Sequence, residues 1–95
     1  MTIVHLIRFT TSDPEQISTQ LRGYKERELD RSPPSGFEKA MILEGTDDRS
    51  VAFYTQWADE AALENTRTSA PWEACMDLSD VFSDAHDETS YEIAS

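Results

Sequence analysis

Cysteine, glycine and positive charge are scarce in this chain of 95 residues. Cys75 is the only cysteine, so an intrachain disulfide and a CxxC redox or metal motif are both excluded, and we expect Cys75 to act as a small hydrophobe in a helix. The three glycines are scattered and form no Gly-rich phosphate loop, and no Ser-His-Asp order or basic aromatic patch appears. Nucleotide hydrolysis and nucleic-acid binding are therefore not expected.

The shortage of positive charge is uneven along the chain. Lys and Arg number 8 against 19 Asp and Glu, which gives a formal net charge of -11. Between Ala58 and Glu88 there are nine acidic residues and one basic residue, Arg67. Such a surface repels nucleic acid and anionic membranes, and it either docks a basic partner or only keeps the protein in solution. Composition leaves both uses of the acidic surface open.

Long apolar runs are missing as well. No stretch approaches the roughly 18 apolar residues of a membrane span, and Met1 leads into a strand pattern rather than a signal peptide. We therefore expect a cytoplasmic protein with no membrane partner. A single domain of this size buries roughly 65% of its unfolded surface, so its core is modest and would gain from dimerisation.

The clearest positive signal is the strand pattern of Ser50–Trp57. Its residues have high β-propensity and alternate with a period of two, with apolar side chains on both faces. Phe37–Glu44 also alternates, and residues 45–49 form a turn between the two segments, which predicts an antiparallel hairpin. The predicted faces of the earlier strand are Phe37, Lys39, Met41 and Leu43 on one side and Glu38, Ala40, Ile42 and Glu44 on the other.

The segment Thr2–Thr10 predicts a further strand with two largely apolar faces. One face carries Ile3, His5, Ile7 and Phe9, and the other carries Val4, Leu6, Arg8 and Thr10. If helices cover the His5 face, then His5 lies between sheet and helices, where burial keeps its imidazole neutral.

The first helix is predicted after this strand. Residues 12–15 form a capping box with Ser12 at the N-cap and Glu15 at N3. The expected apolar stripe is Ile17, Leu21, Tyr24 and Glu28, and the Pro- and Ser-rich segment 32–36 ends the helix.

Two more helices and a last strand complete the pattern. Asp59 is the expected N-cap of a short helix, and Ser69-Ala70-Pro71 ends it and begins the next. Residues 72–85 predict a second amphipathic helix, and residues 89–94 predict a short final strand. His86 is then expected in a solvated loop between them.

The order strand, helix, strand, strand, broken helix, strand is the split βαβ pattern of a ferredoxin-like α+β domain. We expect residues 1–95 to form one such domain, with an antiparallel four-stranded sheet and helices on one face. Because some apolar residues must then face away from the helices, two sheets should pack face to face in a homodimeric barrel.

The chain resembles the antibiotic biosynthesis monooxygenase family of dimeric α/β barrel proteins. The resemblance rests on a strand ending in tryptophan, an acidic-capped helix, a Ser-x-Pro step and a second helix, and it spans essentially the whole chain. The matching segments here are Tyr54–Trp57, Ala58–Ala62, Ser69–Trp72, the strand from Phe37 to Gly45, and Tyr91.

The resemblance implies a mechanism without metal or flavin, so no cofactor is expected. In relatives that oxidise aromatic polyketides, a phenol binds between sheet and helices, and its ionised form reduces oxygen directly. An asparagine, a tryptophan and a tyrosine surround that pocket. Trp57 matches the motif tryptophan, whereas Asn65, Trp72 and Tyr54 match by neighbourhood only. Haem-degrading relatives need a histidine that the segment 65–68 lacks.

The candidate site residues follow from these arguments. His5 is the best general base, although a lone buried histidine is more often structural. The candidates for catalysis are His5, Tyr54 and Trp57, and those for substrate binding are Asn65, Trp72, Phe53 and Met76. No metal site is expected, because His5 and His86 lie far apart in the sequence. Both tryptophans could equally be core residues or the floor of a flat pocket.

Two classes of function remain open. The first is a small cofactor-independent monooxygenase acting on an aromatic polyketide-type substrate in natural-product biosynthesis, or a cyclase using the same pocket. The second is a non-catalytic dimeric binding or accessory protein. An open pocket lined by His5, Tyr54, Trp57, Asn65 and Trp72 favours the enzyme, whereas a space filled by the tryptophans favours the accessory role.

Overall fold

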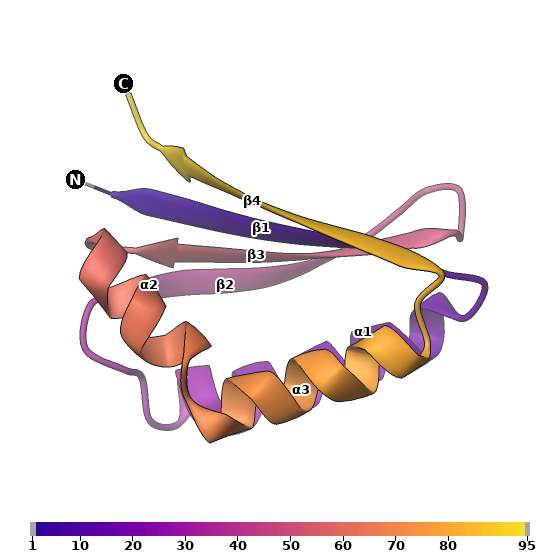
Figure 1. Ribbon diagram of the computed structural model, residues 1–95, viewed down its shortest axis with the longest axis horizontal. Coiled ribbons are helices and arrows are strands. Elements are labelled where there is room, and N and C mark those ends of the chain that lie inside the picture. The colour runs from indigo at the N-terminus through magenta and orange to yellow at the C-terminus, as the bar shows by residue number, and fades with distance from the viewer. Residues whose placement is uncertain (1, 95) are drawn as a thin grey trace.

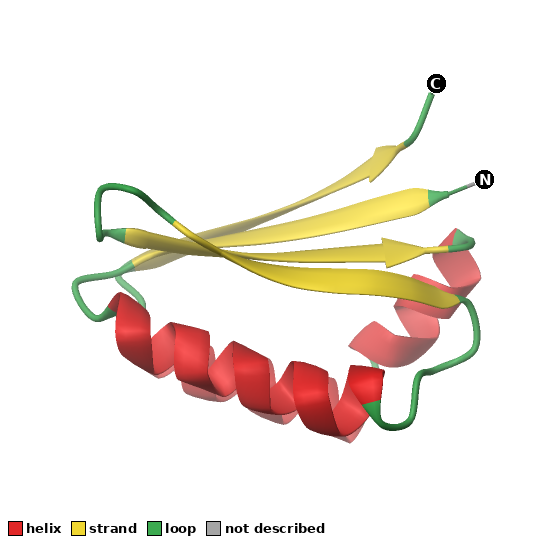
Figure 2. Cartoon of the chain, turned by 180° about the vertical axis from the view of Figure 1, so that it is seen from behind, coloured by secondary structure: helices red, strands yellow, loops and turns green. Residues whose placement is uncertain are grey.

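One antiparallel sheet and one layer of helices make up the computed structural model, which describes residues 2–94 (Figure 1). Met1 and Ser95 lie outside the described residues. The elements in chain order are β1 (Ile3–Thr10), α1 (Pro14–Tyr24), the π-helix η1 (Lys25–Asp30), β2 (Phe37–Glu44), β3 (Ser50–Trp57), α2 (Glu60–Arg67), α3 (Ala70–Val81) and β4 (Ala85–Glu92). The strand order is β2-β3-β1-β4, with every pair antiparallel. All three α-helices lie beneath the same face of the sheet (Figure 2). The ferredoxin-like α+β prediction is therefore confirmed.

The core lies between this face and the helices, and the two central strands supply its sheet side. On β1 the buried face is Ile3, His5, Ile7 and Phe9, as the alternation predicts. On β3 it is Val51, Phe53, Thr55 and Trp57. From below, α1 contributes Ile17, Leu21 and Tyr24, and α3 contributes Trp72 and Cys75.

The opposite face of the sheet has no helix over it (Figure 2). The strand registers place Leu6, Tyr54 and Met41 side by side on it. Leu43 and Tyr91 belong to the same face and are 44% and 54% exposed. An apolar set therefore points away from the helices, as expected from the two-faced strands.

The regular alternation predicted for β2 is wrong at its start. A β-bulge between Phe37 and Lys39 places two residues of β2 opposite one of β3. Phe37 consequently packs against the core together with Ala40 and Ile42, instead of sharing a face with Met41. Its ring meets that of Trp57 edge to face, with centroids 5.3 Å apart.

The stripe predicted for the first helix is also wrong at its end. The last turns are the π-helix η1, in which the residue five positions after Tyr24 returns to the same side. Leu29 is accordingly fully buried, whereas Glu28 is only half-buried. The π-helix thus moves a carboxylate out of the stripe and a leucine into it.

The two predicted N-caps have different outcomes. Asp59 is the N-cap of α2, and its Oδ1 accepts a hydrogen bond from the backbone N–H of Ala62 at 2.9 Å. The capping box at Ser12 is wrong, because the N-cap of α1 is Asp13, which makes no side-chain cap bond. The hydroxyl of Thr11 accepts the Asp13 N–H instead, at 2.9 Å.

The predicted end of the last helix is wrong too. The helix α3 stops at Val81, and β4 already begins at Ala85, well before the expected residue 89. His86 therefore lies in a strand opposite Phe9, not in a loop. Every residue of β4 is exposed. Because the first half of the strand is polar, it has no apolar alternation from which a strand could be predicted.

The two caps give a matched test. Replacing Asp59 by alanine should lower the free energy of unfolding by about 1 kcal/mol, because an N–H of α2 loses its acceptor. Ser12→Ala should change it by less than about 0.5 kcal/mol, since Ser12 is exposed and caps nothing. Urea unfolding followed by circular dichroism measures both. Equal losses for the two variants would contradict this assignment of the caps.

Candidate functional site

The side chain of His5 is enclosed between sheet and helices, and the residue is 2% exposed. Its Nδ1 is 2.8 Å from the hydroxyl oxygen of Ser90, on the neighbouring strand β4. Its Nε2 is 3.3 Å from Oε2 of Glu88, but it makes no hydrogen bond with any residue from 2 to 94. Nδ1 is thus fixed by a hydrogen bond, whereas Nε2 has only an electrostatic contact with Glu88.

Glu88 links this imidazole to a surface ion-pair network. Its Oε2 accepts a hydrogen bond of 2.9 Å from Nη2 of Arg67, and Nη1 of the same guanidinium donates to Oε1 of Glu64 at 2.8 Å. Glu88 is 31% exposed at its side chain. The carboxylate therefore lies between the buried histidine and the solvent.

The environment favours the neutral form of His5. Burial is the main cause and lowers the pKa of His5 below its ordinary value of 6.5, and the charge of Arg67 acts in the same direction. Glu88 and Glu64 oppose this shift and are outweighed. A neutral imidazole can accept a proton, and the Ser90 hydroxyl can bond to Nδ1 in either tautomer because it can donate or accept.

Beside this cluster, an open recess runs between α3 and β4, and we call it the α3–β4 groove. Its volume is about 380 Å³. It is lined by Glu64, Arg67, Thr68, Trp72, Glu73, Met76, Asp77 and Glu88. Two of the predicted substrate-binding residues, Trp72 and Met76, belong to it. Four of its lining residues are carboxylates and one, Arg67, is a cation, so the groove is polar and carries a net negative charge.

Both tryptophans are core residues. Trp57 is fully buried and Trp72 is 3% exposed. The Trp72 ring stacks on Phe53 at a centroid distance of 5.9 Å, meets Tyr24 edge to face at 5.6 Å, and lies 6.3 Å from the His5 ring. Phe53 and Trp57 therefore fill the space between sheet and helices, and neither lines the α3–β4 groove.

Tyr54 lies elsewhere. It belongs to the helix-free face of the sheet, opposite Leu6, and its hydroxyl donates to Oε1 of Gln56 at 2.9 Å. The sheet itself separates it from His5. The pocket expected to contain both residues is therefore not formed within one chain.

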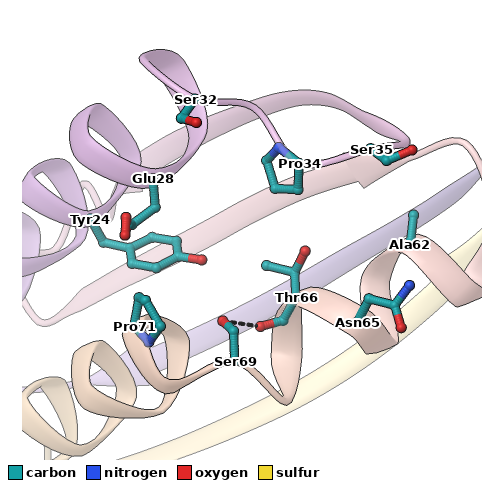
Figure 3. A pocket seen from close by; sticks show the side chains of 10 residues that line it. All are labelled: Tyr24, Glu28, Ser32, Pro34, Ser35, Ala62, Asn65, Thr66, Ser69 and Pro71. Atoms are coloured by element: carbon teal, nitrogen blue, oxygen red, sulfur yellow. Dashed lines mark hydrogen bonds between the residues drawn. The ribbon is translucent and has the colours of Figure 1, made fainter.

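Asn65 lines a different recess, which we call the Tyr24 pocket (Figure 3). It lies where η1, the segment 31–36, α2 and the start of α3 meet, and its volume is about 350 Å³. Its lining residues are Tyr24, Glu28, Ser32, Pro34, Ser35, Ala62, Asn65, Thr66, Ser69 and Pro71. The predicted site residues are thus divided between the α3–β4 groove, the Tyr24 pocket, the core and the far face of the sheet.

Glu88 and Ser90, the two side chains next to the His5 ring nitrogens, were not predicted. Both residues belong to the alternating series His86, Glu88, Ser90 and Glu92. These four side chains share one face of β4 and pair with the buried residues of β1. The series was overlooked because β4 was expected to begin only at residue 89.

Other chemistry has little support among residues 2–94. Burial raises the pKa of the Cys75 thiol to about 11, so it stays protonated and is a poor nucleophile. No group of three or more His, Cys, Asp or Glu side chains in this part of the chain is arranged to hold a metal ion. No helix over the same range is both long and apolar enough to cross a membrane.

Comparisons with known proteins give the fold context. No family model matches the chain, and no curated protein matches it either. Among solved structures, it is similar to Rv0793 from Mycobacterium tuberculosis, with a TM-score of 0.85 and 12% sequence identity over 100% of this chain and 97% of the other.

Two further solved structures carry functional names. SnoaB from Streptomyces nogalater, a cofactor-independent oxygenase, matches with a TM-score of 0.75 and 15% identity over 99% of this chain and 94% of its own. A Nitrosomonas europaea protein provisionally assigned as an antibiotic biosynthesis monooxygenase matches with a TM-score of 0.83 and 13% identity over 98% and 90%. At these identities the likeness establishes the fold alone, which is the ferredoxin-like α+β fold that the sequence predicts.

Proposed function

We propose that this chain is a cofactor-independent oxygenase-type enzyme that acts on a phenolic aromatic compound in the α3–β4 groove. The observation that carries the proposal is the buried, neutral imidazole of His5, whose Nε2 has no hydrogen bond and lies behind the groove residue Glu88. Such a nitrogen is placed to accept a proton from a ligand that displaces the carboxylate. The fold shared with SnoaB supports the same class of reaction.

The chemistry needs only one base and molecular oxygen. His5 takes a proton from the substrate, and the resulting electron-rich anion transfers one electron to oxygen. The two radicals combine to a peroxide on the ring carbon, which loses water to give a carbonyl. One oxygen atom ends in the product and the other in water, so the substrate supplies both electron pairs. A polyketide cyclase would use the same base to form a carbanion, without oxygen.

Residues around the groove have supporting roles in this proposal. Trp72, which is 3% exposed, contributes a small apolar part of the wall, and Met76 is a flexible neighbour that adapts to the shape of the ligand. Arg67 balances the charge of Glu88 and offers the only cation of the groove, beside the anion that deprotonation creates. Asn65, Phe53, Trp57 and Tyr54 do not line it.

We further propose that the active form is a homodimer. The helix-free face carries Leu6, Met41, Leu43, Tyr54 and Tyr91, an apolar set that extends across all four strands. A second copy packed sheet to sheet would cover it and form a closed barrel. Tyr54 would then lie in the dimer interface.

A non-catalytic accessory protein is the second candidate, and one observation favours it. The space between sheet and helices is filled by Trp57, Trp72 and Phe53, and this filling was the feature expected of a protein without a central substrate pocket. Its acidic helices would then bind a partner. The activity measurement below separates the two candidates.

His5→Gln tests the proposed base. With 1,8-dihydroxyanthrone as the probe substrate, wild type should consume oxygen, and the variant should do so roughly 10²-fold or more slowly, because glutamine keeps the size but cannot accept the proton. The acid limb of the wild-type pH–rate profile should lie below pH 6.5, since burial lowers the pKa of His5. An oxygen electrode and the absorbance of the quinone follow the reaction.

His86→Gln is the matched control, because His86 is an exposed histidine on β4 that is paired with Asp80. It should leave the rate unchanged. Equal rates for wild type and His5→Gln would eliminate His5 as the base. No oxygen uptake by wild type with this and related phenols would support the accessory role.

The neutral state of His5 also predicts how stability depends on pH. Unfolded histidine binds a proton near pH 6.5, whereas folded His5 does so only at lower pH, so the free energy of unfolding should decrease as the pH falls below 6.5. The change in urea midpoint between pH 7.5 and pH 5 should be smaller in His5→Gln. An identical change in both proteins would show that His5 is not held neutral.

Light scattering tests the dimer. Wild type should have twice the mass of the 10.8 kDa chain at micromolar concentration, and Leu6→Asp should shift it toward the monomer by placing a charge on the helix-free face. Leu78→Asp is the control, because Leu78 is 50% exposed on α3, on the helix side. A monomeric wild type would overturn the proposed assembly.

A further inference from the structure

We infer that the Tyr24 pocket is a second small-molecule site, separate from the α3–β4 groove, which takes a flat, uncharged compound through a carbonyl oxygen. The central observation is Tyr24 itself. The residue is 1% exposed, yet its hydroxyl points into the pocket and makes no hydrogen bond with residues 2–94 (Figure 3). The hydroxyl is the part of this buried side chain that reaches the pocket, so an acceptor on a ligand could bond to it directly.

The Tyr24 hydroxyl is also held in place. Its ring packs edge to face on Trp72 at 5.6 Å and on Phe53 at 6.2 Å, with interplanar angles near 90° in both cases (87° and 89°). Burial raises the pKa of the Tyr24 phenol, so the group remains a hydrogen-bond donor at any physiological pH. The pocket therefore has a rigid donor in its wall, which is the feature that orients a ligand acceptor.

A second donor lies on the facing helix. Thr66, on α2, is 6% exposed and faces Tyr24 from the other side of the pocket, with its methyl group toward the Tyr24 hydroxyl (Figure 3). The nearby Ser69 hydroxyl is already engaged, because it donates to the carbonyl oxygen of Thr66 at 2.6 Å. Tyr24 and Thr66 both line the pocket, and the hydroxyl of each can donate a hydrogen bond to a ligand oxygen.

The remaining lining defines the chemistry of the ligand. Pro34, Ala62 and Pro71 provide apolar contact, and Glu28 is the only charged residue among those that line the pocket. A carboxylate or phosphate on the ligand would meet the Glu28 carboxylate and no cation, so anions are disfavoured. An uncharged ring compound with a carbonyl group matches both the donors and the apolar contacts.

The backbone around the pocket indicates a preformed site. The π-helix η1 is what leaves Glu28 at the pocket rim while Leu29 enters the core, and π-turns inside helices are frequent at functional sites. On the other side, Gly36 has a φ of 83° and approaches α2 so closely that a Cβ would lie 2.5 Å from that of Ala62. Its carbonyl accepts the N–H of Ala58 at 2.7 Å. The segment 31–36 is therefore anchored against α2.

The Tyr24 pocket and the α3–β4 groove have no lining residue in common. The packed rings of Tyr24 and Trp72 separate them, because Tyr24 lines the first and Trp72 lines the second. A ligand can bind in the Tyr24 pocket whether or not a reaction takes place in the α3–β4 groove. This inference can therefore hold whether or not His5 is a catalytic base.

Three related probes test the inference by NMR titration of the ¹⁵N-labelled full chain. 1-Tetralone carries the carbonyl, tetralin lacks it, and 1-naphthoate replaces it with an anion. We expect 1-tetralone to cause saturable shifts around residues 24, 35 and 66, with clearly weaker effects from tetralin and from 1-naphthoate. In Tyr24→Phe, the Kd for 1-tetralone should rise roughly five- to tenfold, because one neutral hydrogen bond is lost.

Thr66→Val should weaken 1-tetralone binding in the same direction. Tyr54→Phe is the matched control, since it removes a tyrosine hydroxyl on the far face of the sheet, and it should leave the Kd unchanged. His5→Gln should also bind 1-tetralone like wild type, which separates this site from the proposed active site. Unchanged affinity in Tyr24→Phe, equal binding of tetralin, or shifts confined to the α3–β4 groove would each overturn the inference.

Discussion

The packing of the Trp72 ring is the contact on which the other features of this molecule depend. It stacks on Phe53 from the sheet, meets Tyr24 from α1 at its edge, and lies beside the buried imidazole of His5. Large aromatic side chains contribute most of the burial in a domain this small, so the position of α3 under the sheet follows from this cluster. The same ring forms a wall of the α3–β4 groove and holds the ring of Tyr24. Both recesses are therefore shaped by one core residue.

The fold could be predicted well wherever the side chains repeat with a clear period. β1 and β3 have two-faced apolar alternation, and their bounds and buried faces agree with the structure to within a residue. Asp59 was found because an acidic side chain before a run of helix formers has a local cause, the capping of an unpaired N–H. At Ser12 the same rule failed, because α1 begins one residue later than predicted, with Asp13 at the N-cap position.

The candidate site could be predicted only in part, because its residues come from strands whose pairing cannot be derived from the sequence pattern. His5 was identified from its own strand, but its partners Ser90 and Glu88 lie more than 80 residues away in the sequence, on a strand without an apolar pattern. The positions of the half-buried Glu28 and the buried Leu29 depend on a π-helix, which shifts every later side chain by one position relative to an α-helix. Tyr54 was grouped with Trp57 by proximity in sequence, although three positions along a strand reverse the face.

The charge distribution near His5 shows how an acidic surface and a neutral buried histidine can coexist. Two carboxylates, Glu88 and Glu64, approach the imidazole, and alone they would favour its protonated form. Arg67, the one basic residue of its region, bonds to both and brings a positive charge near the ring. The attraction of the carboxylates is thereby partly cancelled, and the cost of removing the imidazolium from water decides the outcome. A chain with a net charge of -11 thus retains a neutral imidazole mainly because burial outweighs the attraction of the nearest acids, and Arg67 adds to the effect of burial.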